Sequence, residues 1–161
     1  MGRYVVVLPL EPLALGDGYP LKTWPLHLTV APTFVIDNPL QAAVSAIAPV
    51  FAFQRPLMLR AGHDEGFGRS ETIPVTVVQQ TIELELLHER LVRELTAVAA
   101  EFDDPHFTGA GYRAHVTMNR TERIHHGDTL HLRQAAIVDM EPDGDERLRN
   151  VVWEQHLRLP G

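Results

Sequence analysis

The tetrads His27-Leu-Thr-Val30 and His115-Val-Thr-Met118 share one pattern, in which a histidine and a threonine alternate with apolar residues. In a β-strand, side chains two positions apart point to the same face. Each tetrad therefore places an imidazole and a hydroxyl on one face, about 6 to 7 Å apart along the backbone, and two apolar side chains on the other. The apolar face predicts packing against a core, and the polar face is left for other contacts.

The composition around the tetrads is that of one folded domain, which we expect to span residues 1–161. The chain is 45% hydrophobic and 22% charged, as is ordinary for a globular protein. It has no cysteine, which excludes disulfides, thiolate zinc sites and cysteine nucleophiles. The net charge of −7 argues against binding of long duplex nucleic acid, which needs clustered Lys and Arg. No apolar run near the start approaches the roughly 20 residues of a membrane span, so we expect a cytoplasmic protein with no membrane partner.

Apolar runs and turn-forming residues divide the chain into strands, loops and two helices. Asn38 and Pro39 predict the N-cap and first residue of a helix that Pro49 stops. Apolar residues spaced by three and four between Leu84 and Phe102 predict a second, longer helix. We expect strands at 4–8, 26–30, 50–60, 73–78 and 114–118, a closing strand pair at 129–140 and 150–159, and loops at 9–25, 61–72 and 103–111. This order predicts an α+β fold with a mostly antiparallel sheet.

The two tetrads suit phosphoryl chemistry if they face each other across a cleft. An imidazole has an unperturbed pKa near 6.5, so at neutral pH one histidine can be neutral and the other charged. Of His27 and His115, one would remove a proton from the attacking oxygen and the other would protonate the departing oxygen. The hydroxyls of Thr29 and Thr117 would donate to the non-bridging phosphate oxygens, where negative charge accumulates. Such chemistry needs no metal and no cofactor.

The tetrads and their surroundings resemble those of the 2H phosphoesterase superfamily, which includes 2′-5′ RNA ligase-like proteins and 2′,3′-cyclic phosphodiesterases. His27-Leu-Thr-Val-Ala-Pro-Thr-Phe34 is similar to the family's first motif, and Tyr112-Arg-Ala-His-Val-Thr-Met-Asn-Arg120 to the second. Ala114 departs from the family pattern, which often has Pro before the second His. The resemblance implies a bilobal, pseudo-twofold α+β fold with helices on the outer faces and a central groove. It also implies that the two His act as acid and base and that the two Thr bind phosphate.

Several residues beside the tetrads are candidate substrate contacts. Basic groups would help an acidic protein to hold a phosphodiester, and aromatic rings can stack on bases. These candidates are Arg120, Arg113, Tyr112, Phe34 and Trp24, with weaker support for Lys22. Phe67 and Arg69, in the glycine-rich stretch 61–72, could make that loop a mobile cover.

Three interpretations of the function remain open from the sequence. The first is a phosphoesterase acting on 2′,3′-cyclic phosphates or 2′-5′ linkages of a small nucleotide or an RNA 3′-end, working as a monomer. The second is a binding module that keeps the groove without turnover, and the third is an interaction protein whose tetrads are accidental. His125, His126 and His131 suggest a metal site only weakly, because no carboxylate partner lies at a convincing spacing.

Overall fold

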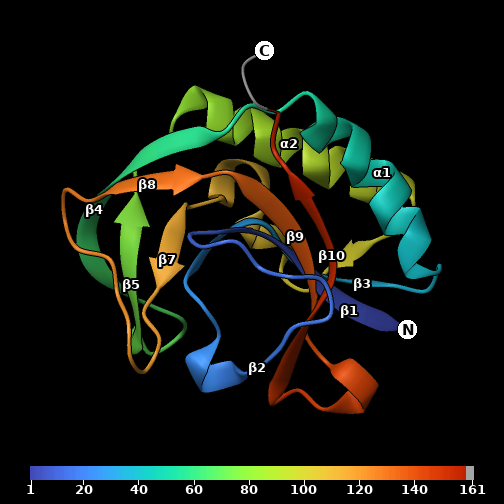
Figure 1. The fold of residues 1–161 in the computed structure, drawn as a ribbon, viewed down its shortest axis with the longest axis horizontal. Coiled ribbons are helices and arrows are strands. Elements are labelled where there is room, and N and C mark those ends of the chain that lie inside the picture. The colour runs from blue at the N-terminus through green and yellow to red at the C-terminus, as the bar shows by residue number, and fades with distance from the viewer. Residues whose placement is uncertain (159–161) are drawn as a thin grey trace.

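The computed structural model describes residues 1–158, so Leu159 of the predicted final strand lies outside the described residues. Its strands build one curled sheet with two α-helices side by side against it (Figure 1). The sheet strands are β1 Gly2–Pro9, β2 Gly18–Pro20, β3 His27–Ile36, β4 Leu57–Phe67, β5 Ile73–Val78, β6 Glu101–Phe102, β7 His115–Thr117, β8 Thr129–Leu132, β9 Gln134–Asp139 and β10 Leu148–His156. The helices are α1 Leu40–Ala52 and α2 Ile82–Ala97, and short 3-10 turns lie at Leu21–Thr23, Pro105–Phe107, Gly109–Gly111 and Pro142–Gly144.

The strand order is β2-β10-β9-β1-β3-β7-β5-β4-β8, with β6 paired to β3, and every pairing is antiparallel. The predicted α+β class and antiparallel sheet are therefore confirmed. The two strands that carry the tetrads, β3 and β7, are neighbours at the middle of this order. One half of the sheet extends from β3 through β1 and the other from β7 through β5, so the tetrads lie where the two halves meet.

The two faces of the sheet carry separate hydrophobic clusters. Leu28 and Val30 of β3 belong to the larger cluster, together with Leu84, Leu87 and the other buried residues of α2. The smaller cluster lies on the opposite face and includes Val7 of β1, whose strand partner is Thr29. Alternation along β3 therefore turns the apolar residues of its tetrad toward the helices and the His and Thr toward the other face.

Helix α2 forms where the spacing of apolar residues predicted a helix, but it ends at Ala97, and Phe102, the last residue of the predicted stripe, lies on β6. Thr81 is its N-cap, and the Thr81 hydroxyl accepts a hydrogen bond from the Leu84 N–H at 3.2 Å. Glu83 and Glu85 lie in the first turn, where negative charge stabilises the helix dipole. Four leucines and His88 form the buried face of this helix.

The predicted limits of α1 were wrong, and of the predicted strand 50–60 only residues 57–60 are extended, as the start of β4. Pro39 rather than Asn38 is the N-cap, and the Asn38 side chain instead donates to the Val98 carbonyl at 3.0 Å. Pro49 lies inside α1, which continues to Ala52. A proline inside a helix removes a backbone hydrogen bond, but continuing the helix buries Phe51 completely. The strand therefore begins only after Pro56.

The stretch 61–72, predicted to be a loop, is mostly a β-hairpin arm. β4 runs on to Phe67 and pairs with β5 down to Phe67↔Ile73, so only the tip turns. The sequence did not indicate this strand, because its side chains lie mostly at the surface and are therefore polar residues and glycines rather than the apolar residues of a buried strand. A Cβ at Gly66 would lie 1.9 Å from the Glu71 carbonyl oxygen, so the close approach of the two strands there requires glycine.

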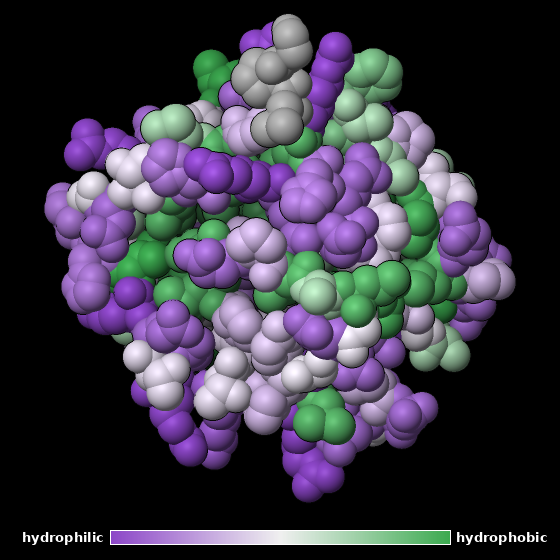
Figure 2. Space-filling model, viewed as in Figure 1, coloured by the Kyte–Doolittle hydropathy of each residue, from purple (hydrophilic) through white to green (hydrophobic). Residues whose placement is uncertain are grey.

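Hydrophilic side chains project around the edges of the face seen in Figure 1, while hydrophobic ones gather nearer its middle (Figure 2). Neither helix within residues 1–158 combines the length and apolar character needed to cross a membrane.

Candidate active site

The structure brings the four polar side chains of the tetrads to one face of the sheet. β3 and β7 pair antiparallel with Leu28 opposite Val116. One residue further in each direction, this register places Thr29 opposite His115 and His27 opposite Thr117. The two histidines are then diagonal neighbours, a relation in which side chains lie about 7–8 Å apart. All four side chains are half-buried and reach solvent, whereas Leu28 and Val116 behind them are buried.

The same backbone contact orients both imidazoles. The Nδ1 atom of His27 lies 2.8 Å from the Pro25 carbonyl oxygen, and the Nδ1 atom of His115 lies 2.8 Å from the Arg113 carbonyl oxygen. A carbonyl only accepts, so each Nδ1 carries a proton and donates it. In the neutral ring Nε2 is then the free base, and in the charged ring Nε2 is the transferable acid. Both rings therefore present the same atom for proton transfer.

Both histidines are held toward their neutral form. Burial lowers the pKa of His27 to about 4, opposed by its hydrogen bond to Pro25 and assisted by the positive charges of His115 and Arg149. Burial also lowers the pKa of His115; the hydrogen bond to the Arg113 carbonyl opposes this shift, and the positive charge of the Arg113 guanidinium adds to it. A charged His115 lowers the pKa of His27, which means that the two rings are close enough to interact in one site. At neutral pH both Nε2 atoms are therefore unprotonated.

A second pair of aromatic side chains supports β3 from the helix side. His88 of α2 is buried and stacks on Tyr112, with ring centroids 3.9 Å apart. The His88 Nδ1–H donates to the Val30 carbonyl at 2.8 Å, and its Nε2 accepts the Gly109 N–H at 3.0 Å. The Tyr112 hydroxyl donates to the Thr29 carbonyl at 2.9 Å. These bonds tie the first tetrad to the segment that precedes the second.

His88 was not among the residues that the sequence predicted. A histidine inside an amphipathic helix carries no local signal that separates a buried bridging role from a surface one.

One aromatic side chain lies against each tetrad histidine. The Trp24 ring stacks on His27, with centroids 3.9 Å apart and planes 26° apart. The Phe67 ring, from the β4–β5 hairpin, lies 4.5 Å from the His115 ring at a 57° tilt. The Arg113 guanidinium lies over Phe67 and forms two hydrogen bonds to Glu65, at 2.9 and 2.6 Å. The hairpin predicted to be a loop thus contributes directly to the surroundings of His115.

The aromatic substrate contacts predicted from the sequence are corrected by burial. Phe34 is completely buried and packs on Tyr4 and Phe102, so it has no free face for a base. Tyr112 is 5% exposed and is used in the bonds behind β3. Trp24 is 9% exposed, and its ring is occupied by contacts within the protein.

The basic candidates remain at the surface. Arg113, Arg120 and Lys22 are exposed. The Arg120 N–H donates to the Lys22 carbonyl at 3.1 Å, and the Asn119 side chain donates to the Trp24 carbonyl at 3.0 Å. These bonds join the segment after the second tetrad to the segment before the first, which keeps Lys22 and Arg120 near the His27 end of the site.

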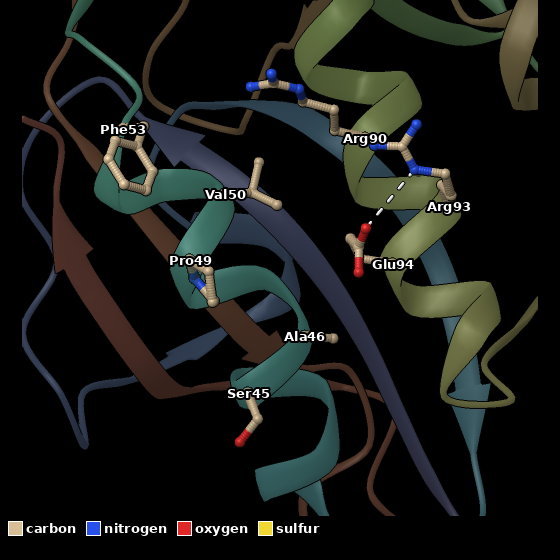
Figure 3. A pocket seen from close by; sticks show the side chains of 8 residues that line it. All are labelled: Ser45, Ala46, Pro49, Val50, Phe53, Arg90, Arg93 and Glu94. Carbon is tan, nitrogen blue, oxygen red and sulfur yellow. Dashed lines mark ion pairs between the residues drawn. The ribbon is translucent and has the colours of Figure 1, made fainter.

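Other places in the fold lack the chemistry of the tetrads. His125 and His126 lie in an exposed turn and His131 on β8, and within residues 1–158 no three His, Asp or Glu side chains gather as metal ligands would. A hollow does lie between α1 and α2, with Phe53 at one end and the ion pair of Arg93 with Glu94 on its far wall (Figure 3). It is on the helix side of the sheet, away from the polar face of the tetrads.

Two His-x-Thr strands thus lie side by side at the centre of an antiparallel sheet in an α+β protein. Comparison with known proteins identifies the family to which this protein belongs. A model described as the 2′-5′ RNA ligase superfamily matches residues 8–149, and the chain belongs to this superfamily. No curated protein sequence matches the chain.

Solved structures show the same fold at low identity. A crystal structure described as a phosphoesterase has a TM-score of 0.62 at 12% identity, covering 97% of this chain and 98% of that one. TT0787 of Thermus thermophilus has a TM-score of 0.61 at 14% identity, covering 99% of this chain and 100% of that one. LigT of E. coli, complexed with ATP, has a TM-score of 0.60 at 15% identity, covering 97% of each chain. The superfamily is named for RNA ligases, so this chain belongs to an enzyme family.

Proposed function

We propose that the protein is a metal-independent phosphoesterase that acts on 2′,3′-cyclic phosphate or 2′-5′ phosphodiester bonds of small nucleotides or RNA ends. The observation that carries this proposal is the register of β3 against β7, which puts two imidazoles and two hydroxyls on one half-exposed face. Complexes of E. coli LigT with ATP and with 3′-AMP support a nucleotide as the ligand class.

In this mechanism the phosphodiester lies between the two Nε2 atoms. One neutral imidazole removes a proton from the attacking water or hydroxyl, and the other, protonated when the phosphate anion binds, gives its proton to the departing oxygen. Each role typically contributes on the order of 10²- to 10⁴-fold in rate. The Thr29 and Thr117 hydroxyls donate to the non-bridging oxygens, and each hydrogen bond to a charged group is worth about 1.5–3 kcal/mol.

Exposed cations assist binding of the substrate. Arg120 and Lys22 are available to further phosphate or sugar oxygens because neither forms an ion pair within residues 1–158. Arg113 and Phe67 flank His115 and offer a cationic and an aromatic surface to a base.

The test is hydrolysis of a panel of 2′,3′-cyclic nucleotides and 2′-5′ linked dinucleotides. His27→Ala and His115→Ala should each lower kcat at least about 100-fold, and Thr29→Ala or Thr117→Ala about 10- to 100-fold. His131→Ala, on the exposed side of β8, is the matched control and should keep the parent rate. Excess chelator should leave the rate unchanged.

Parent rates in both histidine variants would end the acid–base proposal. Tight nucleotide binding with no turnover in the parent protein would instead identify the non-catalytic binding module.

A further inference from the structure

A buried guanidinium lies close behind the first histidine. Arg149 of β10 is 7% exposed, and its Nη1 donates to three backbone carbonyls, those of Met140, Glu146 and Leu148, at 3.0, 2.8 and 2.9 Å. No carboxylate forms an ion pair with Arg149 within the described part of the chain. Its positive charge is therefore held in place by dipoles and is not cancelled by a direct contact.

Arg149 and His27 are connected through one indole ring. The Arg149 guanidinium carbon lies over the Trp24 ring, 5.4 Å from its centroid, and His27 stacks on the same ring at 3.9 Å. Trp24 also belongs to the smaller hydrophobic cluster, with Val7 and Val151, so the ring is packed against the sheet. The three side chains form a stack, Arg149–Trp24–His27, in which each position is fixed by its neighbours.

The stack contains two polar groups that the fold leaves without a partner. The Trp24 Nε1 and the Arg149 Nε are buried and have no hydrogen-bond partner among residues 1–158. A buried donor without a partner typically costs about 1–3 kcal/mol, so stability alone does not explain this arrangement.

We propose that Trp24 and Arg149 are positioning residues that keep the His27 imidazole uncharged, and that His27 is therefore the general base of the reaction. Trp24 excludes solvent from one face of the ring, and Arg149 opposes a second positive charge beside it. The Pro25 carbonyl fixes the proton on Nδ1, which leaves the Nε2 lone pair for the attacking oxygen.

His115, the histidine of the second tetrad, has a different environment from His27. We therefore assign it the role of general acid. Its hydrogen bond to the Arg113 carbonyl is exposed, whereas that of His27 is partly buried. Arg113, which flanks His115, shares its charge with Glu65 through two hydrogen bonds, whereas Arg149 forms no ion pair among residues 1–158. His115 therefore acquires a proton more readily when a phosphate anion binds. This assignment rests on the proposed function, but the state of His27 can be measured without any turnover.

The experiment follows the His27 ring by NMR titration in the parent and in Arg149→Met, which keeps the packing but removes the charge. The charged groups that influence the pKa of His27 are His115 and Arg149, and Asp139, Glu141 and Glu146 act in turn on Arg149. The parent His27 should titrate at about pH 4. Arg149→Met should raise that value by about one pH unit, because a repelling charge is lost. Arg149→Lys should restore the low value.

Two further variants keep the test decisive. Trp24→Leu should also raise the His27 pKa, because solvent then reaches the ring, and it serves in place of Arg149→Met if that variant does not fold. Arg147→Met is the matched control, since Arg147 is exposed and pairs with Asp145. It should leave His27 unchanged.

A His27 pKa that does not move in Arg149→Met or Trp24→Leu overturns the positioning role. An unmoved acidic limb of the rate profile, in a variant whose His27 pKa has risen, overturns the assignment of His27 as base. Absence of turnover in the parent counts against the proposed function and leaves the NMR result to decide the stack.

Discussion

Replacing His88 with Leu should destabilise the protein, although His88 lies on the helix side of β3 and not on the face that carries the tetrads. The side chain is buried and supplies one hydrogen bond to the Val30 carbonyl and one to the Gly109 N–H. Leucine fills similar space but leaves the carbonyl of the buried Val30 without its His88 partner, whereas Gly109 is exposed and water can replace the lost bond there. At about 1–3 kcal/mol for one orphaned buried group, the expected loss is about 1–3 kcal/mol of unfolding free energy. Domains of this kind typically have about 5–15 kcal/mol in total.

The assay is urea unfolding at pH 7.5, followed by circular dichroism and tryptophan fluorescence. The midpoint should fall, with an unchanged dependence on urea concentration if both states keep their compactness. The control is His106→Leu, because His106 is exposed and its ring forms no hydrogen bond within the described residues. A loss below about 0.5 kcal/mol in the His88 variant would refute the bridging role, since surface substitutions alone produce changes of that size.

The pH dependence of stability gives a second measurement on the same residue. Burial lowers the pKa of His88 below its ordinary value, opposed by its bond to Val30. A charged ring would carry a proton on Nε2, which then faces the Gly109 N–H instead of accepting from it. The stabilisation from the neutral ring is complete above the unfolded pKa near 6.5 and is lost as the pH falls toward the lower folded value. His88→Leu should therefore reduce the acid sensitivity of stability below pH 6.5, and an unchanged slope would contradict this protonation state.

Three further predictions concern the fold around the site. Phe51→Ala should cost about 3–5 kcal/mol of unfolding free energy, because Phe51 is completely buried, while Phe53→Ala, at a 73% exposed position, should change it little. Gly66→Ala should distort the β4–β5 hairpin, whose strands leave no room for a Cβ there, and should weaken substrate binding more than it lowers kcat; equal KM values would show that the hairpin takes no part. Thr81→Ala should lower unfolding free energy by about 1 kcal/mol through loss of the N-cap, and Thr81→Ser should restore most of it.

Much of the local structure could be read from the sequence, because it depends on neighbouring residues. Alternation alone placed His27 with Thr29, and His115 with Thr117, on common strand faces. The strand 73–78 and the apolar stripe of α2 follow from periodicity in the same way. Prediction failed where burial of distant groups outweighs local preference, as when α1 continues through Pro49 to bury Phe51.

The sequence by itself determined which reactive side chains are present and how neighbouring ones are oriented: two imidazole–hydroxyl pairs, each on one face of a strand, in an acidic α+β chain. Only the tertiary structure decided that these pairs, 88 residues apart, lie on adjacent strands. It also decided that Phe34 and Tyr112 are buried rather than available to a base, and that Arg149 stands behind His27 through Trp24. The physical reason is that strand pairing and side-chain burial are set by packing over the whole core, whereas alternation along one strand is set by its own backbone.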